Sequence, residues 1–278
     1  YIFNDWRDIE ADRAHAEKRR RPLASGAVSL GVAAGHAFGI PAVATGNFTW
    51  DWIYEHYDGG QSVADRIGDV YRLAATALRM PMWGGFATFP AVRDLPFVAR
   101  RSRREGREGR EVREAFDLPV DRPIVLTSFG GYGLEALDEQ ALTELDGYHV
   151  LTPAAFNDQV LYERGFRYED LVKAVDVVVT KPGYGIISEC LANQTALLYT
   201  SRGDFREYPV LVDAMPAFLR CGFIPHDDLF SGRWQPYLDA VLGQPAPPTM
   251  PATNGADVAA DILLELLCPA KAGRRRNG

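Results

Sequence analysis

A lysine, two glycines and a glutamate lie close together between Asp176 and Glu189, and their types and spacing suit the binding of a phosphorylated ligand. The β-branched block Val177 to Thr180 is typical of a strand buried on both faces of a parallel sheet. The loop Lys181 to Gly185 follows it and leads into a helical stretch. Free N–H groups at the start of such a helix favour a phosphate, and Lys181 adds a positive charge there.

Glu189 lies about one turn into this expected helix, where its carboxylate could accept hydrogen bonds from ribose hydroxyls. The segment Ala196 to Thr200 reads as the next strand, so the whole stretch predicts a β-loop-α-β unit. A tight turn that merely needs glycine would give the same spacing. The local pattern therefore leaves the binding and the structural interpretations both open.

A second unit of this kind begins upstream, and its strand spans Arg122 to Ser128. Its loop contains Gly130, Gly131, Tyr132 and Gly133. Two glycine-rich loops after two different strands favour a doubly wound domain, because such loops meet in one crevice at the carboxyl ends of the strands.

The expected elements outside this unit are less regular. In chain order they are a helix at 30–38, a strand at 41–45, a helix at 62–78, irregular structure at 83–96, a charged connecting helix at 100–114, a helix at 168–174, a helix at 209–220 and a final helix at 256–267. We therefore expect an α/β protein with a partial amino-terminal α/β domain at 1–96 and a ligand-binding domain at 97–278. Because the chain starts at Tyr1 and not at a methionine, it is expected to be a fragment.

Composition narrows the classes of partner and cofactor. The formal net charge of −7 argues against general attraction to nucleic acid. The three cysteines are widely spaced without a CxxC pattern, so neither a structural zinc site nor a disulfide framework is expected. This cysteine usage favours a reducing, cytoplasmic compartment. The uncharged run from Pro22 to Trp50 is interrupted by His36 and Pro41, so no membrane span is expected. The basic tail at 271–276 leaves peripheral membrane contact open.

The quoted motifs resemble a known family. Four segments resemble the carboxyl-terminal domain of family 28 glycosyltransferases of the GT-B fold, such as the N-acetylglucosaminyltransferase that completes lipid II. They are the loops Phe129 to Gly133 and Lys181 to Gly185, the pair Ser188 and Glu189, and the segment Arg202 to Tyr208. The aromatic segment Gly46 to Tyr54 resembles bacterial glycosyltransferase-like proteins and the amino-terminal part of plant L-arabinokinase.

The resemblance implies a GT-B protein in which a Rossmann-like carboxyl-terminal domain binds a nucleoside-diphosphate sugar. It places the nucleobase of the donor near Leu161 and Tyr162, and the ribose at Glu189. It assigns to the donor site the residues Gly130, Gly131, Tyr132, Gly133, Lys181, Pro182, Gly183, Tyr184, Gly185, Ser188, Glu189, Asp204, Arg206 and Glu207.

The sequence also departs from the family pattern. Ile186 stands where the family has a small hydroxyl residue, and an Asp-x-Pro-Pro segment expected near Gly26 to Ser29 is absent. Leu197 stands where retaining GT-B enzymes have a second glutamate, which favours an inverting mechanism. No Asp-x-Asp motif occurs, so no metal and no cofactor is expected besides the sugar nucleotide.

The acid–base candidates are Asp51, within the aromatic segment, and His56, in the loop after it. Asp51 could instead cap the next helix. We therefore expect a glycosyltransferase that moves a sugar, such as one carried by UDP, to an unknown glycan, lipid or small-molecule acceptor. A non-catalytic nucleotide-sugar sensor and a nucleotide-sugar 2-epimerase are the alternatives. Because the family's amino-terminal base is not found, this chain is expected to bind nucleotide without transferring sugar at a useful rate.

Overall fold

The computed structural model describes residues 35–103, 109–129, 145–152 and 158–267, together with residues 32, 142 and 156. The chain divides into two compact units. The first takes residues up to Leu95 and those from Asp257 onward, and the second runs from Pro96 to Ala256. The expected second domain ran to residue 278, whereas the final helix α14 (Gly255–Leu267) lies almost wholly in the first unit. The expected helix at 30–38 lies largely outside the described residues.

The first unit is built on a three-stranded parallel sheet in the order β1-β2-β3. The bounds of its strands and helices are β1 Val43–Phe48, α4 Trp50–Glu55, α5 Gln61–Tyr71, β2 Thr76–Gly84 and β3 Val92–Asp94. Gly85 follows β2 with a φ of +87°, and a Cβ there would lie 2.1 Å from Thr49 Oγ1. Glycine is therefore required where the end of β2 meets the start of α4.

Two expectations for this unit are wrong. The helix expected at 62–78 ends at Tyr71, and Thr76 begins the central strand β2. The segment 83–96, expected to be irregular, contains β3. Alanines favour a helix at 74–77 by propensity, but pairing with strands on both sides outweighs that preference.

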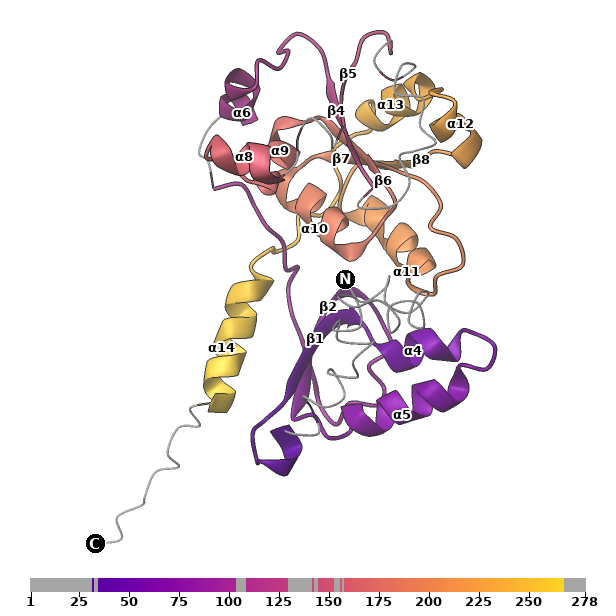
Figure 1. Ribbon diagram of the computed structural model, residues 1–278, viewed down its shortest axis with the longest axis vertical. Helices are drawn as coiled ribbons and strands as arrows, with labels where there is room; N and C mark the ends of the chain where they lie inside the picture. Colours follow the sequence, from indigo (N-terminus) through magenta and orange to yellow (C-terminus); the bar gives the residue numbers. More distant parts are fainter. Residues whose placement is uncertain are drawn as a thin grey trace, which may run out of the picture. The chain divides into compact units, whose positions relative to one another are not determined.

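The second unit is a five-stranded parallel sheet in the order β5-β4-β6-β7-β8. Its strands are β4 Ile124–Ser128, β5 His149–Leu151, β6 Val177–Thr180, β7 Ala196–Tyr199 and β8 Cys221–Phe223. Its helices are α6 Arg110–Ala115, α8 Asp158–Glu163, α9 Tyr168–Ala174, α10 Tyr184–Asn193, α11 Glu207–Ala214, α12 His226–Phe230 and α13 Gln235–Leu242. In Figure 1, α9 and α10 lie on one side of this sheet, while α12 and α13 lie on the other. The unit is therefore a doubly wound α/β layer structure.

The chain passes from β4 to β5 on one side and then to β6 on the other. The direction of winding thus reverses between β4 and β6, and open α/β sheets bind ligands at the carboxyl ends of strands where such a reversal occurs. Sequence correctly predicts β4, β6, α9 and β7 to within two residues. The helix expected at 209–220 ends early, because a 3₁₀ turn with Pro216 follows α11, and the short edge strand β8 follows that turn.

The helix expected at 100–114 is also shorter than predicted. Arg100 to Arg103 are not helical, and α6 begins only at Arg110. Gly109 precedes it with a φ of +65°, and a Cβ there would lie 2.3 Å from the Cα of Ala174. The charge run therefore does not form one solvated connecting helix.

The segment Phe97–Val98 and the segment 252–255 run side by side within the second unit. Phe97 N–H donates to the Ala252 carbonyl at 3.1 Å, and Gly255 N–H donates to the Phe97 carbonyl at 2.9 Å. Val98 and Asn254 form an antiparallel bridge. The two places where the chain passes between the units are therefore bonded to each other on the second unit's side.

Three basic side chains occupy the carbonyl ends of three helices in the second unit. Arg113 donates to the Ala174 carbonyl at the end of α9, and Lys173 donates to the Asn193 carbonyl at the end of α10. Arg220 donates to the Leu242 carbonyl at the end of α13. Cations are stabilised at helix carboxyl ends, so these side chains have a structural role at the amino-terminal edge of the sheet.

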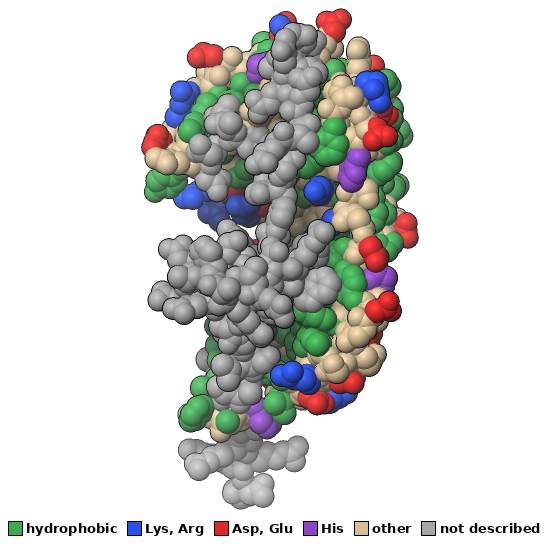
Figure 2. Space-filling view, turned by 45° about the vertical axis from the view of Figure 1, so that its right-hand side comes forward, with side chains coloured by type: hydrophobic (Ala, Val, Ile, Leu, Met, Phe, Trp, Pro, Cys, Tyr) green, Lys and Arg blue, Asp and Glu red, His purple; other side chains and the backbone are tan. Residues whose placement is uncertain are grey.

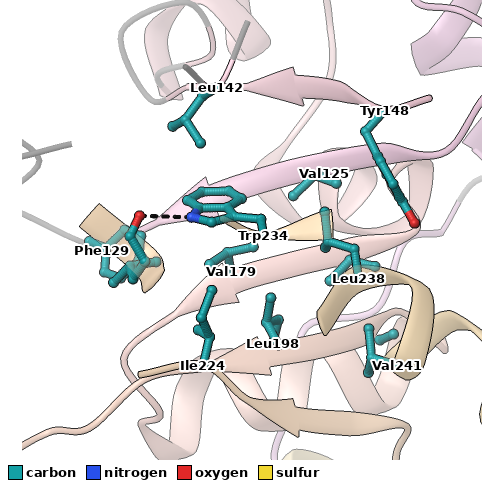
Figure 3. Close-up of a cluster of buried hydrophobic side chains, with 13 residues drawn as sticks. Val125, Phe129, Leu142, Tyr148, Val179, Leu198, Ile224, Trp234, Leu238 and Val241 are labelled. Carbon is teal, nitrogen blue, oxygen red and sulfur yellow. Dashed lines mark hydrogen bonds between the residues drawn. The ribbon is translucent and has the colours of Figure 1, made fainter. Parts of the chain in front are cut away.

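Trp234 is the centre of the core on the α13 side of the sheet. Figure 3 shows its ring among Val125, Val179 and Leu198, which come from three adjacent strands. The side chain is fully buried, and its indole N–H donates to the Leu229 carbonyl at 2.8 Å. The ring thus fills volume and satisfies a buried carbonyl at once.

We predict that Trp234→Phe lowers the free energy of unfolding by about 1–3 kcal/mol, because it removes ring volume and leaves the Leu229 carbonyl without this donor. Urea unfolding followed by circular dichroism would measure the loss. The control is Trp83→Phe at a tryptophan that is 47% exposed. Equal effects of the two substitutions would contradict the central role of Trp234.

Candidate functional site

At the carboxyl ends of β4 and β6, where the direction of winding reverses, hydrogen bonds between the strands fix the backbone. Thr180 is buried at the end of β6, and its hydroxyl donates to the Ser128 carbonyl at the end of β4. On the other side, Thr200 N–H donates to the Thr180 carbonyl at 3.1 Å, which ties the end of β7 to β6. The loops that leave these three strands therefore start from fixed positions.

The loop after β6 ends in an open helix start. Gly183 is the N-cap of α10 with extended backbone, and no side chain caps this end. A Cβ at Gly185 would meet nothing within 4 Å, and one at Gly183 would come only within 3.8 Å of Arg202 Nη1. Space is therefore available in front of the first-turn N–H groups, where an anion is favoured. Lys181 is exposed beside them, and Pro182 is buried.

Two of the predicted donor-site residues instead point into the fold. The Tyr184 hydroxyl accepts a hydrogen bond from Val98 N–H at 3.1 Å, and its ring stacks on Phe97. Burial raises the pKa of Tyr184 to about 12, so it stays neutral. Ser188 is 1% exposed, and its hydroxyl donates to the Gly185 carbonyl at 2.9 Å. Both side chains thus hold α10 in place.

Glu189 is buried on α10, and its partner is an arginine that sequence reasoning missed. The Arg100 guanidinium donates to Glu189 Oε1 at 2.5 Å and lies 3.9 Å from Glu169 Oε2. Arg100 is 61% exposed at its side chain, so the pair borders solvent. The carboxylate expected to meet a ribose therefore holds a displaceable cation in this structure.

The segment from Val98 to Ser102 follows the same helix. Asn193 donates to the Arg100 carbonyl at 3.1 Å and accepts from Ser102 N–H at 3.0 Å. Together with Tyr184 and Glu189, it gives α10 a row of side chains that bind this extended segment. Such long-range contacts cannot be read from the local spacing of the motif.

The loop after β7 contains the remaining predicted donor-site residues. Glu207 is 3% exposed in the first turn of α11, and its carboxylate accepts from Arg202 at 2.8 Å. Asp204 is exposed, and Arg206 is half-buried. The structure brings Arg202 to the Gly183 loop, where its Nη1 also donates to the Pro182 carbonyl at 3.3 Å. Sequence reasoning passed over Arg202, although it lies in the same segment.

A cavity of about 470 Å³ lies next to the Arg100 and Glu169 pair. Leu161, expected at the base pocket, is fully buried, whereas Tyr162 is exposed and lines this cavity. The lining residues are Arg100, Gln159, Tyr162, Phe166, Arg167, Tyr168 and Glu169. Aromatic rings and an amide of this kind suit a planar heterocycle.

The acid–base candidates lie in the first unit and differ in exposure. Asp51 is 5% exposed, and its two carboxylate oxygens accept hydrogen bonds from Trp52 N–H at 2.8 Å and from the Thr88 hydroxyl at 2.6 Å. His56 is exposed at the end of α4. The structure therefore gives these residues different surroundings. Gly130, Gly131, Tyr132 and Gly133 lie outside the described residues.

The face drawn in Figure 2 carries basic, acidic and hydrophobic side chains among those in colour. No helix in the described part of the chain combines the length and the apolar character needed to cross a bilayer. The start of α10 lies at the reversal point of the sheet, and Lys181 and Arg202 lie beside it.

The ion pair of Glu189 can be tested by stability. Because Glu189→Gln replaces a buried charge-assisted hydrogen bond, we expect the free energy of unfolding to fall by about 1 kcal/mol, with the exposed partner limiting the effect. Glu169→Gln is the matched control, since its carboxylate lies beyond hydrogen-bond distance of Arg100. Denaturant unfolding that ranks the two variants the other way round would contradict this assignment.

No known family model matches the chain. Its sequence is similar to L-arabinokinase of Arabidopsis thaliana, with 29% identity over 240 residues. That match covers 82% of this chain but only 22% of L-arabinokinase, so the chain spans less than a quarter of that protein's length.

Two solved structures share the fold. CalG4, the calicheamicin glycosyltransferase, matches with a TM-score of 0.53 and 13% identity over 86% of this chain and 70% of its own. UGT89C1 of Arabidopsis thaliana, complexed with UDP, matches with a TM-score of 0.52 and 15% identity over 84% of this chain and 69% of its own. With its two parallel sheets, this chain has the α/β fold of the GT-B glycosyltransferases.

Proposed function

We propose that the second unit binds the diphosphate of a nucleoside-diphosphate sugar in front of α10, and that the chain serves sugar transfer from this donor to an acceptor. The observation that carries the proposal is the uncapped start of α10 at the reversal point of the sheet, with Lys181 exposed beside it. First-turn N–H groups and a lysine supply hydrogen bonds and positive charge to the same phosphate oxygens.

The nucleoside then extends from the diphosphate along α10. Glu189 lies on that helix beyond its first turn, and the cavity with Tyr162 and Gln159 adjoins Arg100, its ion-pair partner. A ribose hydroxyl that donates to Glu189 would either displace Arg100 from the carboxylate or bind the carboxylate together with it. The heterocycle would enter the cavity. UDP is the first ligand to try, because the fold relative UGT89C1 is complexed with it.

The transfer step needs charge stabilisation on the leaving group. As an acceptor hydroxyl attacks the anomeric carbon of the sugar, the bond from that carbon to the phosphate oxygen breaks, and negative charge grows on the departing diphosphate. The α10 N–H groups and Lys181 would stabilise that charge in the transition state. In-line attack gives inversion. As proton acceptor we propose Asp51 or His56, the two acid–base candidates of the first unit.

A nucleotide-sugar sensor without catalysis is the second candidate. It is favoured by the likeness to L-arabinokinase, which is named a kinase while this chain has a glycosyltransferase fold. A 2-epimerase is less well supported, because Glu207, one of its two candidate carboxylates, is buried against Arg202.

A thermal-shift screen of UDP-, GDP- and dTDP-sugars on the purified chain tests donor binding, since a ligand that binds only the folded state raises its melting temperature. Product analysis with a labelled sugar nucleotide then separates the two candidates. Transfer of label to an acceptor, by this chain or by one extended with upstream sequence, supports the enzyme. Saturable binding without transfer by either chain supports the sensor. If none of the three series shifts the melting temperature, both fail.

We predict that Lys181→Ala weakens UDP binding by about 1–3 kcal/mol, the size of a charged hydrogen bond, with little change in the melting temperature of the free protein. Isothermal calorimetry measures the affinity. Lys173→Ala is the control, because that lysine caps the opposite end of the same helix. Should Lys181→Ala bind UDP as tightly as the parent, Lys181 has no phosphate role.

A further inference from the structure

Arg202 is held in a fixed position beside the loop that opens α10. Its Nη1 donates to Glu207 Oε2 at 2.8 Å and to the Pro182 carbonyl at 3.3 Å. The guanidinium carbon lies 4.5 Å from the centroid of the Phe205 ring, which is itself buried. The side chain is 18% exposed, so a cation is kept at this place and still reaches the surface.

Glu207 is the residue that fixes this arginine. Its side chain is 4% exposed, and a carboxylate so far removed from water is stable only with a close positive partner. Glu207 lies in the first turn of α11, so the helix also stabilises its charge. The resemblance predicted that Glu207 contacts the donor sugar, whereas the structure turns its carboxylate to Arg202. Glu207 is thus placed to position Arg202.

Arg202 lies close to Gly183 at the start of the helix. A Cβ at this position would lie 3.8 Å from Arg202 Nη1, and it would meet no other group within 4 Å. Lys181 leaves the end of β6, and Arg202 leaves the end of the neighbouring strand β7. Two cations from adjacent strands therefore flank one glycine turn. A planar guanidinium, which carries five N–H donors, suits two oxygens of a phosphate.

From these contacts we infer that Arg202 is the second cation for the donor's diphosphate, and that Glu207 is its positioning residue. The inference rests on the proposed function and adds a selectivity to it. With Lys181 and Arg202 both present, the site matches a diphosphate rather than a monophosphate. Arg202 would remain hydrogen-bonded to Glu207 through Nη1 while the other N–H groups of its guanidinium meet the ligand.

The test compares a diphosphate with its monophosphate. Calorimetry of UDP and UMP gives the ratio of their dissociation constants for the parent and for Arg202→Met combined with Glu207→Gln, a pair that avoids a buried unpaired carboxylate. We expect the UDP affinity of this variant to fall at least tenfold and its UMP affinity to change less than threefold. Arg202→Lys, which keeps the charge without the planar fork, should fall between the parent and this variant.

Glu207→Gln alone keeps Arg202 but loosens it, so it should lower UDP affinity by less than the combined change. Arg233→Ala is the matched control, since Arg233 pairs with Asp228 on an exposed surface of the same unit. The control should keep the parent's ratio. Melting temperatures of all variants show whether each is folded.

The inference is overturned if the combined variant keeps the parent's preference for UDP over UMP, or if it loses both ligands equally. Should the parent bind UDP and Lys181→Ala weaken that binding while the Arg202 variants do not, the proposed function stands and only Arg202 loses its role. If the parent binds none of the UDP, GDP and dTDP series, the proposed function falls, and the role of Arg202 falls with it.

Discussion

The arrangement of the second unit depends on one constraint, the parallel course of its strands. Right-handed β-α-β connections place every helix start at the carboxyl edge of the sheet and every helix end at the amino edge. The partial charges of the helices therefore separate, positive at one edge and negative at the other. At the negative edge, Arg113, Lys173 and Arg220 each donate a hydrogen bond to the carbonyl at the end of a helix. At the opposite edge, the start of α10 is left without a side-chain cap.

The helix α10 serves the fold and the site at once. Ile187 and Cys190 lie on its buried side, while Tyr184, Glu189 and Asn193 form hydrogen bonds with the segment 98–102. Only its start and the adjoining loop remain open. This division explains why the hydroxyls of Ser188 and Tyr184, which the motif assigns to the site, form hydrogen bonds within the protein. A short sequence motif marks the helix that carries a site, but it does not separate the ligand side from the side that faces the protein.

Local chemistry allowed much of the second unit to be predicted. A β-branched block followed by Lys181 and glycines has few other structures open to it, so β6, the loop and α10 could be placed by pattern alone. The strand β2 could not, because a central parallel strand with alanines has the composition of a helix. The pairs of Arg100 with Glu189 and of Arg202 with Glu207 were also missed. The first joins residues far apart in the chain, and the second depends on a left-handed turn at Gly203.

The bonds between Phe97 and residues 252–255 define where the second unit can be cut free. A recombinant fragment that started after Arg103 would remove the bonds of Asn193 to residues 100–102 and leave the buried Glu189 carboxylate without Arg100. One that stopped before Ala252 would lose the backbone pairing with Phe97. Residues 96–256 therefore form the natural piece for expression. Both of its ends emerge together, so they could be joined by a short linker, and the start of a circularly permuted unit could be moved elsewhere.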